Sequence, residues 1–431
     1  MKRRALLGFS ALVLALVLAL AAAQRASRPS AVDFFITADT QGFLVPCGCR
    51  TVPAGGLARR AAAMEAFRKT CGAESMIPIE VGHGFAERGP GRDKLNRRMG
   101  EFFASTGTLV GLGSYDLLLG PEALRMAAPG APLFIAGRPP YKGSKEFLLG
   151  GWRIGPLAFG GRTLRVVFLS ATEPGGVAMD DPIRVMAREV KDHPADRYVV
   201  MGQLPASTVV GLLKAEPAVL AAAVQWGTNV TTVPQKVSDD RWVLYLGDRG
   251  RRAATLRVAW SSDRWSVRPE ISYLGPDTPS DAKVAAEVDA TLKDVEEINA
   301  EALKGMSAPA KPGEGFLGEA KCLPCHAAAH KKWAISPHAR ATKDLAIDHQ
   351  QQNPDCLICH ATGLGKPGGY PQAAPDLSGV QCEACHGAGE GHPPRKLAVQ
   401  PAGPEACGRC HTRRDSPLFD AEGYWKLMEH R

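Results

Sequence analysis

Aromatic residues are scarce in this chain of 431 residues, of which Phe, Trp and Tyr make up 6%. The sequence also lacks a stripe of Lys and Arg with interleaved aromatic side chains, a pattern typical of nucleic-acid binding. We therefore predict no nucleic-acid partner and assign the formal net charge of +8 to a solvated surface. Residues 314–431 hold 13 Lys/Arg and 13 Asp/Glu, so the positive excess lies upstream.

The long apolar run of this chain lies at its N-terminus. Met1-Lys2-Arg3-Arg4 precedes apolar residues 5–23, and a basic segment before a hydrophobic one is typical of an export signal. Residues 1–30 are predicted to be a signal peptide or N-terminal anchor, with residues 5–23 long enough for membrane anchorage. No cysteine follows closely, so a lipoprotein anchor is unsupported. The remaining chain is predicted to be periplasmic or on the extracytoplasmic face of the membrane.

Eight of the 11 cysteines form four copies of one pattern, C-x-x-C-H. The copies are Cys322-Leu-Pro-Cys325-His326, Cys356-Leu-Ile-Cys359-His360, Cys382-Glu-Ala-Cys385-His386 and Cys407-Gly-Arg-Cys410-His411. This is the attachment sequence of c-type haem, because the two thiols can bond two vinyl groups of one porphyrin and the histidine can bind its iron. Zinc is the main alternative, but zinc sites do not require a histidine after every second cysteine. The sequence therefore predicts four c-type haems.

Residues 31–275 combine short apolar runs with helical patterns. Strands are predicted at Val32–Ala38, Met76–Val81, Val166–Ser170, Tyr198–Met201 and Trp242–Leu246, and helices at Leu57–Arg68 and Ala206–Glu216. Segment 253–273 alternates in polarity and predicts antiparallel strands. Strands interleaved with helices predict a layered α/β domain over residues 31–275.

The segment 276–315 is predicted to connect two domains. It contains a long amphipathic helix from Ser280, as N-cap, to Gly305, and then a Pro/Gly linker, Ser307–Gly315. Residues 316–431 are rich in Gly, Pro and Ala and predict a mainly helical, loop-rich domain. Because this segment has few apolar side chains to bury, we expect the porphyrins to supply its core and the segment not to fold without them.

The N-terminal domain resembles the 5′-nucleotidase-type metallophosphatases over residues 32–260. The resemblance rests on Phe34-Phe-Ile-Thr-Ala-Asp39-Thr-Gln41-Gly42 and on Gly55-Gly56-Leu-Ala-Arg59-Arg60, where the family has Asp-x-His-Gly and Gly-Gly-x-Ala-Arg. Weaker matches occur at residues 78–83, 115–122, 201–204 and 226–229. In that family two metal ions activate a water molecule and bind a phosphoryl group.

Most of the metal ligands that the resemblance implies are replaced in this sequence. Asp39 is kept, but the histidine after it becomes Gln41 and the aspartate of the second strand becomes His83. The Asn-His pair becomes Pro121-Glu122, and two later histidines become Gln203 and Thr228. Proline has no side-chain ligand and threonine seldom binds such metals, so we predict a pseudoenzyme with no catalytic residue.

Three cysteines lie outside the haem motifs: Cys47, Cys49 and Cys71. A structural disulfide from Cys47 or Cys49 to Cys71 is the favoured interpretation in an oxidising compartment, and it leaves one odd thiol. A redox-active or metal-binding Cys47-Gly-Cys49 is the alternative.

Residues 316–431 resemble the tetrahaem cytochromes c that accept electrons from hydroxylamine oxidoreductase. The matching stretches are Phe316–Cys322, Trp333–Ala339, Asn353–Gly363, Gly379–His392, and Ser416–Phe419 with Tyr424, Trp425 and His430. The resemblance implies close-packed haems, most of them with two histidine ligands. Some members of that family have one haem whose iron is open.

Five histidines of this region are candidate distal ligands beside the proximal His326, His360, His386 and His411. His338, His392 and His430 stand at positions that match the family and are predicted first. His330 and His349 are secondary candidates, because His330 shares a helix face with His326 and His349 can equally be a solvated loop residue.

We therefore predict an exported tetrahaem c-type cytochrome that carries electrons between redox partners, its donor and acceptor unidentified, with a non-catalytic metallophosphatase-like domain. One alternative is a haem enzyme that acts on a small nitrogen oxide or peroxide at a five-coordinate haem. A second is an active metal-dependent phosphatase or nucleotidase fused to a redox module.

Overall fold

The computed structural model describes residues 31–46, 53–72, 75–134, 153–159, 161–226, 231–247, 249–348, 350–372, 374–392, 402–412, 416 and 419–430. The predictions for residues 1–30, Cys47, Cys49, Thr228 and His349 lie outside these residues. Within these ranges, no helix is both long and apolar enough to cross a membrane.

The N-terminal part is built on two six-stranded mixed sheets. The first has the order β12-β11-β1-β2-β3-β4 and consists of β1 (Ala31–Ala38), β2 (Met76–Val81), β3 (Leu109–Gly111), β4 (Leu133–Phe134), β11 (Arg252–Ser261) and β12 (Arg264–Tyr273). The second has the order β5-β6-β7-β8-β10-β9 and consists of β5 (Arg153–Phe159), β6 (Arg162–Ser170), β7 (Arg197–Gln203), β8 (Val219–Gln225), β9 (Gln235–Ser238) and β10 (Arg241–Tyr245). The β1–β4 strands are mutually parallel, whereas β11 runs antiparallel to β1 and to β12, as segment 253–273 predicted.

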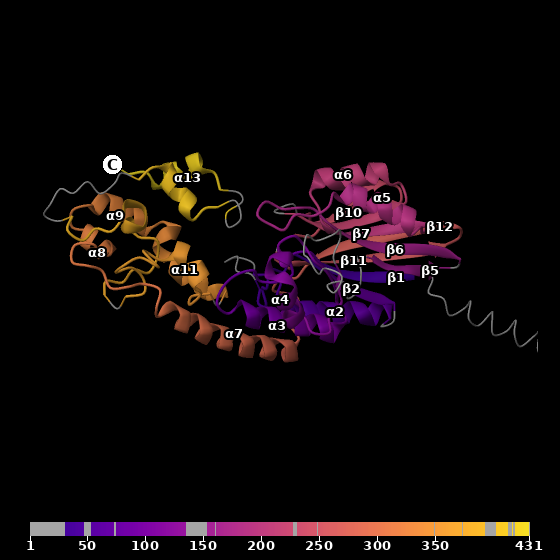
Figure 1. Ribbon diagram of the computed structural model, residues 1–431, viewed down its shortest axis with the longest axis horizontal. Coiled ribbons are helices and arrows are strands. Elements are labelled where there is room, and N and C mark those ends of the chain that lie inside the picture. The colour runs from indigo at the N-terminus through magenta and orange to yellow at the C-terminus, as the bar shows by residue number, and fades with distance from the viewer. Residues whose placement is uncertain are drawn as a thin grey trace, which may run out of the picture.

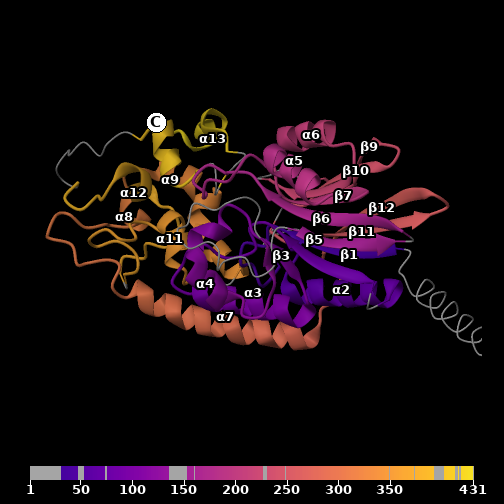
Figure 2. The same ribbon diagram turned by 45° about the vertical axis from the view of Figure 1, so that its right-hand side comes forward.

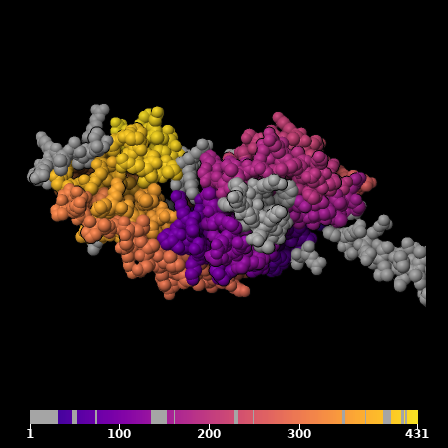
Figure 3. Space-filling view, in the orientation of Figure 1, coloured from indigo at the N-terminus to yellow at the C-terminus, as the bar shows by residue number. Residues whose placement is uncertain are grey.

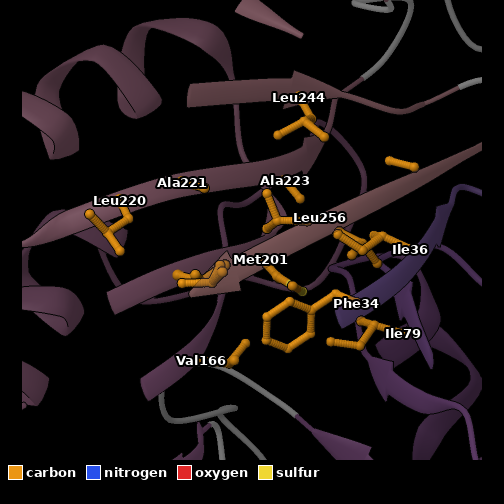
Figure 4. Close-up of a cluster of buried hydrophobic side chains, with 14 of the residues drawn as sticks. Phe34, Ile36, Ile79, Val166, Met201, Leu220, Ala221, Ala223, Leu244 and Leu256 are labelled. Carbon is orange, nitrogen blue, oxygen red and sulfur yellow. The ribbon is translucent and has the colours of Figure 1, made fainter. Parts of the chain in front are cut away.

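The main hydrophobic core lies between the two sheets. Phe34 and Ile36 of β1 and Ile79 of β2 pack with Val166 of β6 and Met201 of β7, and all five are fully buried (Figure 4). Phe35 points to the opposite side of β1 and packs against Met64 of a covering helix, since alternate strand residues face opposite sides. Burial on both faces explains the nearly continuous apolar run of β1.

Helices cover the outer faces of both sheets. α2 (Leu57–Cys71), α3 (Arg92–Thr106), η1 (Asp116–Leu119) and α4 (Gly120–Ala127) lie on the side of the first sheet, and α5 (Pro182–Asp192) and α6 (Ala206–Ala215) on that of the second (Figure 1). The arrangement has four layers, helix, sheet, sheet and helix. It confirms the predicted layered α/β class.

The helix α7 (Ala282–Leu303) runs along the first helical layer and continues to the C-terminal part (Figures 1 and 2). Its N-cap is Asp281, whose carboxylate accepts a hydrogen bond from the Val284 N–H at 2.9 Å, so the predicted Ser280 cap is wrong by one residue. Lys94 and Arg98 of α3 form ion pairs with Asp294 and Glu287 of α7 at 2.9 and 3.0 Å. These contacts bind α7 to the N-terminal domain.

The C-terminal segment is mainly short helices and loops, as predicted, and forms a lobe of its own (Figure 3). Its elements are α8 (Glu319–Cys322), α9 (Ala327–Ala334), η3 (Pro337–Arg340), α10 (Ala341–Asp344), η4 (Leu345–Asp348), α11 (Pro354–His360), α12 (Cys382–His386), η5 (Pro404–Arg409) and α13 (Ala421–Met428). A small apolar cluster joins Leu303, at the end of α7, to Leu345 and Leu357. The last turn of α7 therefore packs in this lobe.

Candidate functional site

Each C-x-x-C-H motif of the C-terminal lobe lies on or beside one helical turn. The second and third motifs lie in α11 and α12, and the fourth begins within η5 at Cys407 and ends just after it. In the first and fourth motifs the histidine N–H donates to the carbonyl of the leading cysteine, His326 to Cys322 and His411 to Cys407, both at 2.9 Å. One helical turn brings the two thiols and the imidazole to the same side of the backbone, as attachment of one porphyrin requires.

Three of the four motif histidines face a second imidazole. The ring centroids are 6.2 Å apart for His326 and His392, 6.2 Å for His338 and His411, and 5.8 Å for His386 and His430. A metal ion between two imidazoles, with nitrogens at about 2 Å on each side, places the ring centroids about 6 Å apart. The three pairs therefore have the separation that a six-coordinate iron with two histidine ligands requires.

The remaining motif histidine, His360, does not face a second imidazole within the described part of the lobe. Its Nδ1 lies 3.0 Å from the carbonyl oxygen of Ala341, and because a carbonyl only accepts, Nδ1 carries the proton and Nε2 is left for a metal. Of the two secondary candidates, His330 directs Nε2 at the carboxylate of Glu319, and His349 is outside the described residues. His330 thus engages a carboxylate in place of a proximal ring.

Burial keeps two of the paired imidazoles in the neutral, metal-binding form. The pKa of His338 is lowered by burial and then by the neighbouring His411 and His360, and that of His411 by burial and His360. His411 and His430 are also oriented through Nδ1, by the Ser416 hydroxyl at 3.1 Å and the Met428 carbonyl at 2.9 Å. Such contacts fix the ring orientation of a metal ligand.

Cysteines of different motifs come together and define which motifs are neighbours. The thiols of Cys322 and Cys382 lie close together, which makes the first and third motifs neighbours. Cys359 and Cys410 likewise lie close together, which makes the second and fourth motifs neighbours. Cys385 lies close enough to Cys407 for their charges to interact, which connects the third motif to the fourth. The motifs therefore follow the spatial order first, third, fourth, second.

A second cluster of polar residues lies in the N-terminal domain, where strands of both sheets end. Asp39 is buried and accepts hydrogen bonds from Gln41 Nε2 at 2.9 Å, Gln225 Nε2 at 3.2 Å and the Arg249 N–H at 3.2 Å. Its carboxylate also contacts Nδ1 of His83 at 3.0 Å. Protein donors thus surround the one carboxylate that the metallophosphatase resemblance retains.

His83 lies between two carboxylates, Asp39 on Nδ1 and Glu87 on Nε2. Burial favours the neutral ring, but the hydrogen bonds to Asp39 and Glu87 outweigh it and raise the pKa of His83 to about 10. The imidazolium is therefore a fixed cation at this place. Asp39 and His83 both have positive φ angles, 57° and 49°, a strained backbone often kept at functional sites.

The other substituted positions are spread apart or bonded elsewhere. Gln203 is buried, accepts from the Ser114 N–H at 2.6 Å and donates to Glu173 at 2.6 Å. Glu122 lies exposed in the first turn of α4. Across the described ranges, no group of three or more His, Cys, Asp and Glu side chains has an arrangement suited to a metal ion.

Glu87 and Gln225 also belong to this cluster, although neither residue was predicted from the sequence. Glu87 follows His83 by four residues, but the segment between them is not helical, so the helical spacing rule does not account for their contact. Gln225 ends β8, a strand that was not predicted, and no local pattern points to it.

The lone cysteine of the described N-terminal domain is a free thiol. Cys71 ends α2 with a free thiol, and the predicted link to Cys47 or Cys49 involves partners outside the described residues. Its thiol contacts the carbonyl of Gly72 at 3.7 Å.

Comparison with known proteins separates the two parts of the chain. Residues 321–387 match the family model "Cytochrome c554 and c-prime". Cytochrome c-554 of Nitrosomonas europaea is 37% identical over 92 residues, 17% of this chain, and the chain spans about two fifths (39%) of that relative. The match concerns the C-terminal segment alone.

Two solved structures share the fold of the N-terminal part. The sulfate thiohydrolase SoxB of Thermus thermophilus superposes with a TM-score of 0.51 at 12% identity, covering 62% of this chain and 61% of that one. The NAD nucleotidase NadN of Haemophilus influenzae gives 0.51 at 11% identity, covering 67% and 64%. At such identities the likeness concerns the fold. Residues 321–387 thus match the cytochrome c554 and c-prime family, and the N-terminal part shares its fold with SoxB and the nucleotidase NadN.

Proposed function

We propose that this protein is an exported tetrahaem c-type cytochrome that transfers electrons between redox partners. The observation that carries the proposal is the set of three facing imidazole pairs in a lobe that holds four C-x-x-C-H motifs. Bound haem supplies an iron that takes up and releases one electron. His326, His360, His386 and His411 are the proximal ligands, and His392, His430 and His338 close the first, third and fourth sites respectively.

The protein residues set the route that electrons follow. Thiol contacts between Cys322 and Cys382, and between Cys359 and Cys410, support adjacent first and third haems and adjacent second and fourth haems. The proximity of Cys385 to Cys407 supports a connection between the two pairs. We infer a continuous path from the first site to the second, whose two ends serve donor and acceptor. C-type attachment and the N-terminal basic and apolar segment support an extracytoplasmic location.

The N-terminal domain has a supporting role in this proposal. The carboxylate of Asp39 is engaged by Gln41, Gln225, His83 and a backbone N–H, so a metal ion would have to displace hydrogen bonds that are already formed. Close contact between the domains supports a structural task. Gln351, near the second motif, donates to Glu296 of α7 at 2.8 Å.

A second candidate function rests on His360. Because its ring faces no second imidazole within the described residues, an iron held by His360 would be open to a small ligand such as nitric oxide, nitrite or peroxide. The protein would then be a haem enzyme in which the other three sites supply electrons.

Electron paramagnetic resonance of the oxidised protein tests both functions. Electron transfer with a closed second site predicts low-spin ferric signals alone, unchanged by nitric oxide. An additional high-spin signal that nitric oxide alters would favour the second candidate. Hydrolysis of bis(p-nitrophenyl) phosphate with added manganese would contradict a non-catalytic N-terminal domain.

A further inference from the structure

Glu383 stands between the two cysteines of the third motif, and its carboxylate is buried with 4% of the residue exposed. The carboxylate accepts backbone N–H groups of three residues: Leu317 at 2.9 and 3.1 Å, Gly318 at 2.8 Å and Gly389 at 2.7 Å. Such donors hydrogen-bond the oxygens of a buried carboxylate and hold the side chain in one position.

The three donors come from two segments that serve the first haem site. Leu317 and Gly318 lead directly into α8, which ends at Cys322 of the first motif. Gly389 begins the turn that presents His392, because the His392 N–H donates to the Gly389 carbonyl at 2.9 Å. The neighbouring Gln381 adds a parallel contact by accepting the Glu319 N–H at 2.7 Å. One side chain of the third motif therefore fixes both the proximal and the distal sides of the first site.

The charge of Glu383 is balanced by backbone dipoles. Among its described contacts there is no ion pair with Lys or Arg. The net negative charge therefore stays beside Cys382 and, through the thiol contact of Cys382 with Cys322, beside the first motif as well. A buried negative charge stabilises the oxidised, more positive iron over the reduced one, and so lowers the reduction potential.

We propose that Glu383 is a positioning residue that holds His392 opposite His326 and, by its charge, keeps the first and third haems at low reduction potential. This inference rests on the haem ligation proposed above. The first and third haems would then form the donor end of the electron-transfer path, because electrons move from sites of lower reduction potential to sites of higher reduction potential.

The test is a spectroelectrochemical titration of the full-length, haem-loaded protein, with Glu383→Gln compared with wild type. We expect an unchanged haem content and an upward shift of one or two of the titration components. Glu383→Asp keeps the charge and should leave these potentials near those of wild type, while its shorter side chain alters the low-spin resonance of the His326–His392 site. Glu390→Gln is the matched control, because Glu390 is a carboxylate of the same loop that accepts one hydrogen bond among the described residues, from the Gly315 N–H at 2.7 Å.

Wild-type potentials in Glu383→Gln would overturn the charge role, and an unaltered low-spin resonance in Glu383→Asp would overturn the positioning role. If Glu383→Gln binds fewer haems than the wild type, the Glu383→Asp variant decides. Reduction potentials of Glu383→Asp near those of the wild type support the proposal, and an upward shift of these potentials despite the conserved charge overturns it. A wild-type protein without haem would instead contradict the proposed function, so the two failures are distinguishable.

Discussion

Replacement of His392 by alanine opens the iron of the first site. The ring of His392 faces that of His326 at 6.2 Å, and the described lobe offers no other imidazole to that ring. His330 is on the helix that follows His326 but is bound to Glu319. The His392→Ala variant should therefore retain covalent haem, since the Cys322 and Cys325 thiols are untouched, while its first site changes from six-coordinate low-spin to five-coordinate high-spin.

The expected change in the number of low-spin irons follows from the number of imidazole pairs. Each of the three pairs predicts one low-spin iron in the wild type, and the variant should have one low-spin iron fewer than the wild type. Spin quantitation in the oxidised state should show the loss of one low-spin iron and the gain of one high-spin iron per chain. Added imidazole should restore the low-spin form, because it can occupy the space of the lost ring.

His330→Ala is the matched control for this experiment. It removes a histidine of the same lobe whose Nε2 contacts a carboxylate, so the low-spin count should not change. An unchanged low-spin count in His392→Ala relative to the wild type, or a loss in His330→Ala, would refute the assignment of distal ligands.

Three further predictions concern stability and folding. Glu80→Ala should destabilise the N-terminal domain by about 3–5 kcal/mol, because it leaves Arg60, with 2% of its side chain exposed, as an unpaired buried charge. Urea unfolding measures this loss. The control Glu65→Ala removes an exposed ion pair with Arg68 and should cost under about 1 kcal/mol. The raised pKa of His83, about 10 against 6.5 for the unfolded chain, contributes stability that is fully present below pH 6.5 and is lost as the pH rises through 10. Unfolding across this range should show a loss of at most about 5 kcal/mol, and His83→Gln should flatten the slope; a slope that persists in the variant would contradict the assignment. Protein made without haem should show a protease-resistant N-terminal domain and a cleaved segment after residue 315, whereas resistance of the whole chain would show that the lobe folds by itself.

The extent to which the fold is predictable differs between its strands. β1 and β2 were recognised because β-branched and aromatic residues dominate them. β8 was missed because its sequence, Val-Leu-Ala-Ala-Ala-Val-Gln, has three alanines, which favour helix in isolation. All seven residues are buried on the two faces of a central strand, where packing outweighs local propensity.

The functional sites also differ in how far the sequence alone predicts them. Haem attachment is a local motif and was read directly. The pairing of His392 with His326 or of His430 with His386 joins segments 44 to 66 residues apart, and only the fold shows which rings meet. The predicted loss of metal ligands identified Asp39 and His83, but the enclosure of Asp39 by Gln225 and Arg249 depends on strands far apart in the chain.

The central claim is that four haems are bound covalently to one chain. Intact-mass analysis of the purified protein, combined with pyridine haemochrome quantitation, tests it most directly. We predict four haems per chain that resist acidic extraction. Fewer than four, extractable haem, or zinc in place of iron would contradict the account.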